Sequence, residues 1–302
     1  MANSAFYQHY PLPSSLKQNQ KPTIADLQKR GLIDAKGKVK PAPYAAYYAG
    51  DYDSAAWLYN QLRSKWDDPK RGSVPIGWAI DSELSMRFPV IYKYLYQTKT
   101  PNDFFISGDS GAGYLNPTLL LPDAKTGRRG DSPITKSGAT AWIKWNTEWY
   151  RKFDLSFTGF LINGNQGKLT NQSIAIYDSF SPDGVVVTTG NDPVHSSMSG
   201  AAWIDAAGTP VLHRVTDMST DVKSAAQQIA DIVHGDQKLV SGQPTFYFLR
   251  NILQSASYMA EVAEASKALV HDIEFVDPYT MGLLVKVANG VLPRGTDSVA
   301  FV

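Results

Sequence analysis

The chain has 302 residues, and its 43% hydrophobic content is enough to bury a sizeable core, which excludes a wholly disordered protein. The 29 basic and 28 acidic residues leave a net charge of +1 with no long segment of one sign, so we expect no nucleic-acid partner. The absence of cysteine excludes disulfides, thiolate zinc sites and cysteine nucleophiles.

The N-terminal stretch 1–16 shows no basic segment followed by an apolar core, so no signal peptide is visible. No apolar run approaches the roughly 20 residues that span a bilayer. We therefore expect a soluble protein without a membrane span. The cellular compartment and the oligomeric state stay open.

In chain order, residues 1–40 are polar and rich in proline, which predicts an N-terminal arm. From residue 41 to residue 302, apolar strand-like runs alternate with helix-like segments, a pattern typical of parallel βαβ units. The expected strands span residues 44–50, 74–80, 103–107, 154–162, 184–189, 209–215, 245–249 and 272–276. The expected helices span residues 54–65, 83–97, 138–152, 222–234, 256–269 and 281–288.

This order predicts an α/β fold, a TIM-like (β/α) barrel of seven or eight strands. An open doubly wound sheet also fits the alternation. It is disfavoured because no glycine fingerprint for a dinucleotide follows the first strand.

Polar side chains crowd the positions where the expected strands end. In a parallel barrel these ends form the functional face. Hydrolysis of a glycosidic bond needs two carboxyl groups there, one protonated and one ionised. The polar residues at the expected strand ends, which include several carboxyl groups, are Asp51, Asp53, Asp81, Glu83, Asp109, Asn163, Asp217, Arg250, Glu274 and Asp277.

Each acidic residue also has a structural interpretation. Asp53, Asp81 and Asp277 precede expected helices and are typical N-cap residues. Glu274 lies inside an apolar strand, where a buried acid is costly unless it is paired or used. It would point into the barrel, unless its strand lies at an edge or Arg250 is its partner.

The stretch 108–117 is the most informative loop. Its glycines allow positive φ or a close approach of the backbone to a ligand, while Asp109 and Tyr114 supply a carboxylate and a ring. A tight connection that merely needs glycine is an equally good interpretation. Phosphate binding is disfavoured, because no Gly-Lys-Ser/Thr follows.

Within this loop, Gly111-Ala112-Gly113-Tyr114-Leu115-Asn116-Pro117 resembles the signature of the GxGYxYP family, which is described as putative glycoside hydrolases. The resemblance continues in order through residues 50–57, 66–72, 75–79, 100–105 and 276–280. It implies a barrel-like C-terminal catalytic domain, which in many exported bacterial relatives follows another domain.

This chain departs from the family pattern at one clear position. Asn116 replaces a tyrosine of the signature, so a sugar-stacking role is lost there. Asp81 and Glu83 stand where the resemblance leads us to expect less acidic residues. We therefore do not rank these two among the family's catalytic positions.

Our hypothesis is a glycoside hydrolase that acts on a poly- or oligosaccharide by carboxylate acid/base catalysis. Asp53 and Asp109 are the first catalytic pair, with Asp51 and Glu274 in reserve. With 12% aromatic residues, the chain offers rings on which sugars could stack, although most of them should serve the core. The expected substrate-binding residues are Trp78 and Tyr114 for a sugar ring, and Arg250 and Asn163 for hydroxyls or a carboxylate.

Two other functions remain open, and we expect no cofactor and no metal. A non-catalytic carbohydrate-binding barrel would keep the aromatic residues and use its acids as caps and ion pairs. A metal-dependent deacetylase is disfavoured, because the five histidines show no paired ligand spacing. Asp192 with His195 is the one combination that could contribute to such a site.

Overall fold

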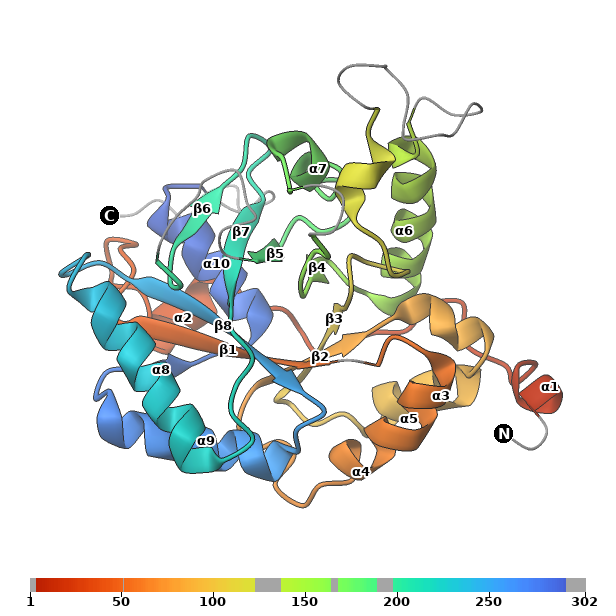
Figure 1. Cartoon of the computed structure of the whole chain (residues 1–302), viewed down its shortest axis with the longest axis horizontal. Coiled ribbons are helices and arrows are strands. Elements are labelled where there is room, and N and C mark those ends of the chain that lie inside the picture. Colours follow the sequence, from red (N-terminus) through yellow and green to blue (C-terminus); the bar gives the residue numbers. More distant parts are fainter. Residues whose placement is uncertain (1–3, 51, 123–136, 164–167, 189–197, 292–302) are drawn as a thin grey trace.

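The computed structural model describes residues 4–50, 52–122, 137–163, 168–188 and 198–291. Within these ranges, seven parallel strands close into a barrel surrounded by helices (Figure 1), which confirms the predicted TIM-like α/β fold. Closure is made by the first strand, which pairs with the strands on both sides of it. Around the barrel the strands are β2 (Ile76–Ile80), β3 (Asp103–Ser107), β4 (Phe157–Thr158), β5 (Gly184–Thr188), β7 (Pro210–Val215), β8 (Thr245–Ile252) and β1 (Pro43–Gly50).

Two short strands add to this barrel. β6 (Ala202–Ile204) pairs antiparallel with β7. β9 (Glu274–Phe275) pairs with β1 at Tyr44 and Ala45, whereas β2 pairs with β1 further along, at residues 47–49. Because β8 occupies the other edge of β1 throughout, β9 and β2 share one edge. The expected strand 272–276 is therefore only a short addition at the amino end.

Most expected helices are present with small shifts in their bounds. Figure 1 shows α8 and α9 side by side along β8 and β1, with α6 on another flank of the barrel. None of the helices in the described ranges has the length and hydropathy of a bilayer-spanning segment. The helices are α1 (Ser4–Tyr7), α2 (Ile24–Lys29), α3 (Ala55–Trp57), η1 (Leu58–Leu62), α4 (Arg63–Trp66), η2 (Ser82–Met86), α5 (Pro89–Thr98), η3 (Pro117–Leu120), α6 (Ala139–Phe153), α7 (Asn171–Ala175), α8 (Val222–Gln237), α9 (Ala256–Leu269) and α10 (Pro278–Ala288).

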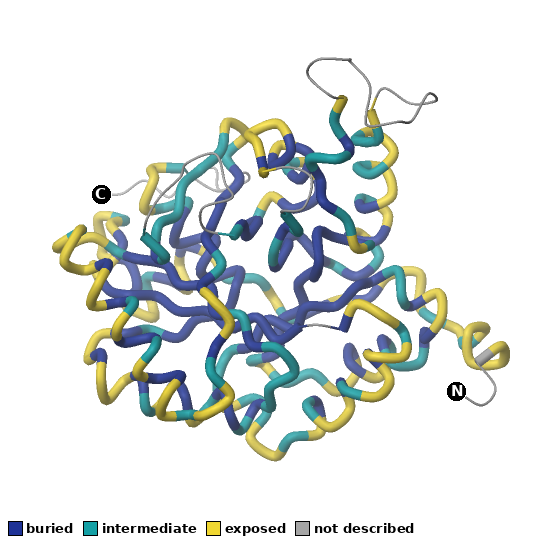
Figure 2. Tube along the Cα trace, viewed as in Figure 1, coloured by how far each residue is buried: buried dark blue, intermediate teal, exposed yellow. Residues whose placement is uncertain are grey.

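The strands separate two apolar cores, and side-chain alternation decides which residue enters which core. On β1, Tyr44, Ala46 and Tyr48 belong to the core inside the barrel, whereas the intervening residues pack against the surrounding helices. Since both faces of β1 are covered, the whole strand is buried and reads as a continuous apolar run. In Figure 2 the buried strands lie at the centre, and the exposed surface follows the outer faces of the helices.

The amino end of the barrel is closed by α10 and by the segment before β1. Gly282 of α10 lies so close to the strand start at Asp183 that a Cβ would sit 2.0 Å from the Asp183 carbonyl oxygen. Gln18 accepts a hydrogen bond from the backbone N–H of Phe105 at 3.2 Å and donates to the Tyr279 hydroxyl at 2.8 Å. Much of the expected arm 1–40, from Leu16 onward, therefore packs on the barrel, whereas α1 is exposed. Where a domain boundary falls remains a prediction.

Candidate functional site

The alternation that fills the barrel also carries charged side chains to its carboxyl rim. On three strands, the last apolar side chain that points into the barrel is followed two residues later by a charged residue. Alternation along the strand places this charged residue on the same inward face. Because these strands are parallel, the three charged positions meet at the same end of the barrel. The successions are Ala79 then Asp81 after β2, Leu212 then Arg214 on β7, and Phe248 then Arg250 on β8.

Three carboxyl groups gather at this rim, and we call Asp81, Glu83 and Asp109 the rim acids. Asp81 and Asp109 are buried, with exposed fractions of 2% and 3%. Glu83 lies on η2, directly after β2, where burial and the nearby Asp109 carboxylate together raise its pKa to about 7. The carboxylates of Asp81 and Glu83 both lie close enough to the buried Tyr92 to add to the rise of its pKa, which is caused first by burial.

Asp109 is held in an unusual backbone conformation. Its φ is 31° and that of Ser110 is 73°, values in the left-handed region that non-glycine residues rarely adopt. The loop is fixed from two sides: the Ile162 N–H donates to the Ser110 hydroxyl at 2.7 Å, and the Tyr177 hydroxyl donates to the Ser110 carbonyl at 2.6 Å. These contacts fix the backbone next to Asp109.

The glycines of the same loop serve its packing against α6. Gly111 has a φ of 120°, and a Cβ there would lie 2.4 Å from the Asn146 side-chain oxygen. That oxygen accepts the Ala112 N–H at 2.7 Å, and the Trp145 indole N–H donates to the Ala112 carbonyl at 2.7 Å. The described contacts thus support the interpretation that the glycines are needed for a tight connection.

The buried Tyr48 lies between the charged groups. Its ring fills the space left by three glycines at the ends of β1, β3 and β4; a Cβ on Gly50 or Gly159 would lie 2.0 or 2.6 Å from ring atoms. A Cβ on Gly108 would lie 3.3 Å from the Tyr48 hydroxyl oxygen and 2.9 Å from an Asp81 carboxylate oxygen. Tyr48 and Asp81 therefore meet beside Gly108.

Two arginines, the arginine pair Arg214 and Arg250, occupy the opposite side of Tyr48 from the rim acids. One Nη1 of each donates to the same Asp217 carboxylate oxygen at 2.8 Å. Their guanidinium carbons lie 6.0 and 5.2 Å from the centre of the Phe160 ring, which itself packs edge-on against Tyr48. Burial lowers the pKa of Arg214, an effect that the Asp217 carboxylate opposes.

The expected substrate-binding residue Asn163 also reaches this rim. The neighbouring backbone is anchored to the Asp109 loop, since the Ile162 N–H bonds to Ser110. The amide nitrogen of Asn163 is buried and makes no hydrogen bond to any described residue. It is therefore a donor that a ligand hydroxyl could use.

Two other expected site residues, Asp53 and Glu274, do not join this group, and a third lies outside the described residues. Asp53 follows β1 at the same rim but is exposed, and Asp51 lies outside the described residues. Glu274 lies at the amino end, beside Tyr44, where it pairs with Lys40 at 3.5 Å and keeps a 39% exposed side chain. The strand that should have pointed it into the barrel is too short to reach the rim.

The two expected sugar-stacking rings have different surroundings. Trp78 is fully buried between sheet and helices, where its indole N–H donates to Asp103 at 2.8 Å and its ring packs edge-on against Trp66. This position serves the outer core and does not suit contact with a sugar. Tyr114 is 65% exposed and so remains available to a ligand.

Of the three acids interpreted as helix caps, one caps its helix and two do not. Asp277 caps α10, accepting the Thr280 N–H at 2.8 Å. At α3 the cap is Ser54 rather than Asp53. Asp81 precedes η2 without making a side-chain capping bond, so a cap does not explain this buried acid. Asn116, the departure from the family signature, caps η3 by accepting the Thr118 N–H at 3.0 Å.

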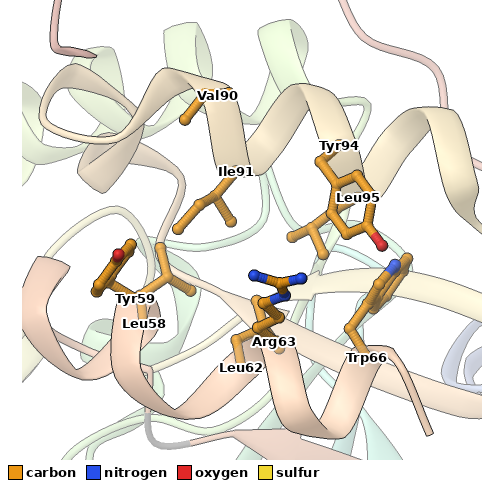
Figure 3. A pocket seen from close by; sticks show the side chains of 9 residues that line it. All are labelled: Leu58, Tyr59, Leu62, Arg63, Trp66, Val90, Ile91, Tyr94 and Leu95. Carbon is orange, nitrogen blue, oxygen red and sulfur yellow. The ribbon is translucent and has the colours of Figure 1, made fainter.

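The described residues of the rim offer no candidate metal cluster, and an apolar hollow lies elsewhere on the surface. Among the described residues no group of three or more histidine or acidic side chains could hold a metal ion; Asp192 and His195 lie outside them. A hollow of about 330 Å³ lies on the outer surface between η1 and α5 (Figure 3), and no acidic residue lines it. Its lining residues are Leu58, Tyr59, Leu62, Arg63, Trp66, Val90, Ile91, Tyr94 and Leu95.

Comparison with known proteins decides the family. The family model described as "GxGYxYP putative glycoside hydrolase C-terminal domain" matches residues 42–286, which is most of the chain. The chain belongs to the GxGYxYP family. The match covers every barrel strand and all three rim acids. No curated protein sequence matches the chain.

A solved structure supports the fold of this GxGYxYP domain. A crystal structure from Bacteroides thetaiotaomicron, described as a putative hydrolase, has a TM-score of 0.66 at 15% identity. The alignment covers 94% of this chain but 51% of that one, so the chain spans about half the length of this neighbour. An uncharacterized protein from Agrobacterium tumefaciens aligns with a TM-score of 0.42 at 12% identity over 87% of this chain and 99% of that one.

Proposed function

We propose that this GxGYxYP domain hydrolyses glycosidic bonds of a poly- or oligosaccharide, with Glu83 as the general acid and Asp109 as its ionised partner. The observation that carries the proposal is the gathering of the rim acids at the carboxyl end of the barrel, where the pKa of Glu83 is raised to about 7. The family description and the description of the Bacteroides structure support hydrolase chemistry.

Such chemistry requires one protonated and one ionised carboxyl group. Glu83 holds its proton up to near-neutral pH and can give it to the leaving oxygen. Asp109, when ionised, can attack the anomeric carbon or activate a water molecule. Tyr114 and Asn163 are proposed to contact the sugar. Glu83 replaces Asp53 in the pair that the sequence suggested, because Asp53 is exposed while Glu83 interacts with Asp109.

The proposal is tested by incubating the protein with a panel of glycans and analysing the products. Glu83→Gln and Asp109→Asn should each fold and lose roughly 10²- to 10⁴-fold in turnover, the usual contribution of a positioned acid or base. Glu261→Gln is the matched control, because Glu261 lies on α9 and pairs with Lys70 on the surface. Circular dichroism and thermal unfolding verify that each variant is folded.

Asp53→Asn separates the present pair from the sequence-based pair. Full turnover in Asp53→Asn supports Glu83, whereas a loss as large as in Asp109→Asn restores Asp53 to the mechanism. Full turnover in Glu83→Gln or Asp109→Asn removes that residue. Glycan binding without product release, even after long incubation, would instead indicate a non-catalytic carbohydrate-binding barrel.

A further inference from the structure

The arginine pair is not used by the chemistry proposed above. Arg214 and Arg250 are set into the rim, with side chains 20% and 15% exposed, and they share Asp217, which is 47% exposed. The Nε of Arg214 is buried and, among the residues that the structure describes, no acceptor lies within hydrogen-bond distance of it. A buried guanidinium donor without an acceptor is unfavourable unless a ligand completes it.

The position of the pair connects it to the rim acids. Both guanidinium groups lie over Phe160, whose ring contacts Tyr48, and the Tyr48 hydroxyl lies near Gly108 and Asp81. In register, Tyr48 is the direct β1 neighbour of Arg250. A ligand held by the arginines would therefore extend over Tyr48 toward the carboxyl groups.

The chemistry of the pair selects the ligand. A guanidinium group donates two parallel N–H bonds to two oxygens of a planar or tetrahedral oxyanion. A single neutral hydroxyl does not offer this pair of charged acceptors. Asp217 already shows that a carboxylate can bind both arginines at once. The rim acids would repel an anionic group, so the side of the rim that carries the arginine pair is the favourable one for an anion.

We propose that the arginine pair binds an oxyanion carried by a sugar ring, a carboxylate or a sulfate ester, so that the substrate is an acidic glycan. This inference rests on the proposed function, since it concerns the sugar next to the bond that is broken. Asp217 bridges the two arginines, and an oxyanion of the ligand would supply the acceptor for the Arg214 Nε–H.

Binding is tested on the Asp109→Asn protein, which should retain ligands without turnover. The probes are tetrasaccharides of glucuronate, galacturonate and mannuronate, the methyl esters of the same three, and a sulfated galactose tetramer with its unsulfated counterpart. The ester removes the charge and keeps the ring, and the two kinds of probe distinguish carboxylate from sulfate. Calorimetry should show at least one anionic probe binding about tenfold or more tightly than its neutral partner, with weaker binding at high salt.

Variants assign this preference to the pair. Arg214→Gln and Arg250→Gln should abolish the preference, and Arg214→Lys, which keeps the charge but loses the fork, should retain part of it. Arg151→Gln, on the exposed face of α6, removes the same charge elsewhere and should bind as before. Thermal unfolding verifies folding, and the Arg214→Lys variant keeps the test valid if a glutamine variant is unstable.

Equal affinity for all charged probes and their neutral partners overturns the inference, as does an unchanged preference in a folded Arg214→Gln protein. These results differ from a failure of the proposed function. Cleavage of a neutral glycan with no effect of Arg214→Gln removes the acidic substrate and keeps the hydrolase. Arginine-dependent binding of a uronate that the unmodified protein never cleaves keeps the anion site and removes the hydrolase.

Discussion

Glu83 has an environment that differs strongly from that of a carboxyl group in water. Burial comes first among the causes that raise its pKa from 4.5 to about 7, and the Asp109 carboxylate adds to the rise. Buried tyrosines, Tyr92 and Tyr150, lie close enough to feel the charges of Asp81 and Glu83. The consequence is a proton that the folded protein keeps up to near-neutral pH.

This shift predicts both an activity profile and a stability profile. As the general acid, Glu83 must be protonated, so turnover should fall as pH rises through about 7. The folded state binds this proton more tightly than the unfolded state does. The free energy of unfolding should therefore decrease between pH 4.5 and pH 7, by roughly 3 kcal/mol at most.

Glu83→Gln cannot lose this proton, so its Tm should fall less between pH 5 and pH 8.5 than that of the unmodified protein. Calorimetric unfolding at the two pH values measures the difference. The residual activity of the variant should also lack the alkaline decline. An identical loss of Tm in both proteins would show that Glu83 does not titrate with a raised pKa.

At the scale of elements, the connection from β3 to α6 determines where Asp109 points. It uses positive φ values at Asp109, Ser110 and Gly111, and α6 supports it through the Asn146 side chain. The alternation of apolar residues says nothing about such a connection, because its geometry depends on a helix that begins about 30 residues later. Sequence reasoning found the glycines here but left open whether they serve a ligand or the packing.

Gly111→Ala should displace this connection. The added methyl group would lie 2.4 Å from the Asn146 side-chain oxygen, and the alanine would have to adopt a φ of 120°. We therefore expect a large loss of turnover, while the barrel remains folded. Gly242→Ala is the control, since Gly242 has a φ of 72° but no atom within 4 Å of the added carbon. Turnover and Tm measured on both variants separate backbone strain alone from displacement of the loop. Equal turnover in the two would show that the Asn146 contact is unimportant.

The elements also show what the sequence could and could not predict. Apolar runs within residues 43–50, 76–80, 104–106 and 246–249 predict β1, β2, β3 and β8, because strands buried on both faces need such runs. Side chains of a strand alternate between its two faces, so the next inward positions after Leu212 and Ala79 are Arg214 and Asp81, two residues further on. The sequence alone is therefore enough to rank these two residues. The family pattern argues against ranking Asp81 and Glu83, and a helix cap is a further interpretation of Asp81.

Other features depend on tertiary contacts that no local pattern encodes. The expected strand 154–162 is short because Gly159 turns the chain close against Tyr48. Trp78 looked like a sugar platform, but the buried Asp103, which also forms an ion pair with Arg71, binds its indole in the outer core. Glu274 misled because β9 and β2 share one edge of β1, which keeps β9 at the amino end.

At the scale of the whole molecule, the barrel is closed at one end and carries the proposed site at the other. The amino end is filled by α10 and by the segment that precedes β1, whose Leu27, Leu32 and Val39 belong to the same core as the barrel interior. Stability should therefore be concentrated at the amino end. Variants there should change unfolding without changing the chemistry of the rim.

Gly282→Ala tests this division. The added Cβ would lie 2.0 Å from the Asp183 carbonyl oxygen, and this clash is relieved only if α10 moves. We therefore expect a loss of roughly 3 kcal/mol or more in stability. Gly235→Ala is the matched control, an exposed helix position on α8 with nothing within 4 Å of the added carbon. It should stabilise the protein by about 0.5 to 1 kcal/mol. Denaturant unfolding measures both, and an unchanged midpoint for Gly282→Ala would contradict the packing of α10.

The separation of charges around Tyr48 has a consequence for how a polymer would lie on the protein. The rim acids come from β2 and β3 and the arginine pair from β7 and β8, with β1 between them. A polysaccharide has a reducing and a non-reducing end, and under the proposals above its charged unit and its breaking bond have fixed places on the rim. The chain could then thread in only one direction, so successive cuts would release fragments with the same terminal unit.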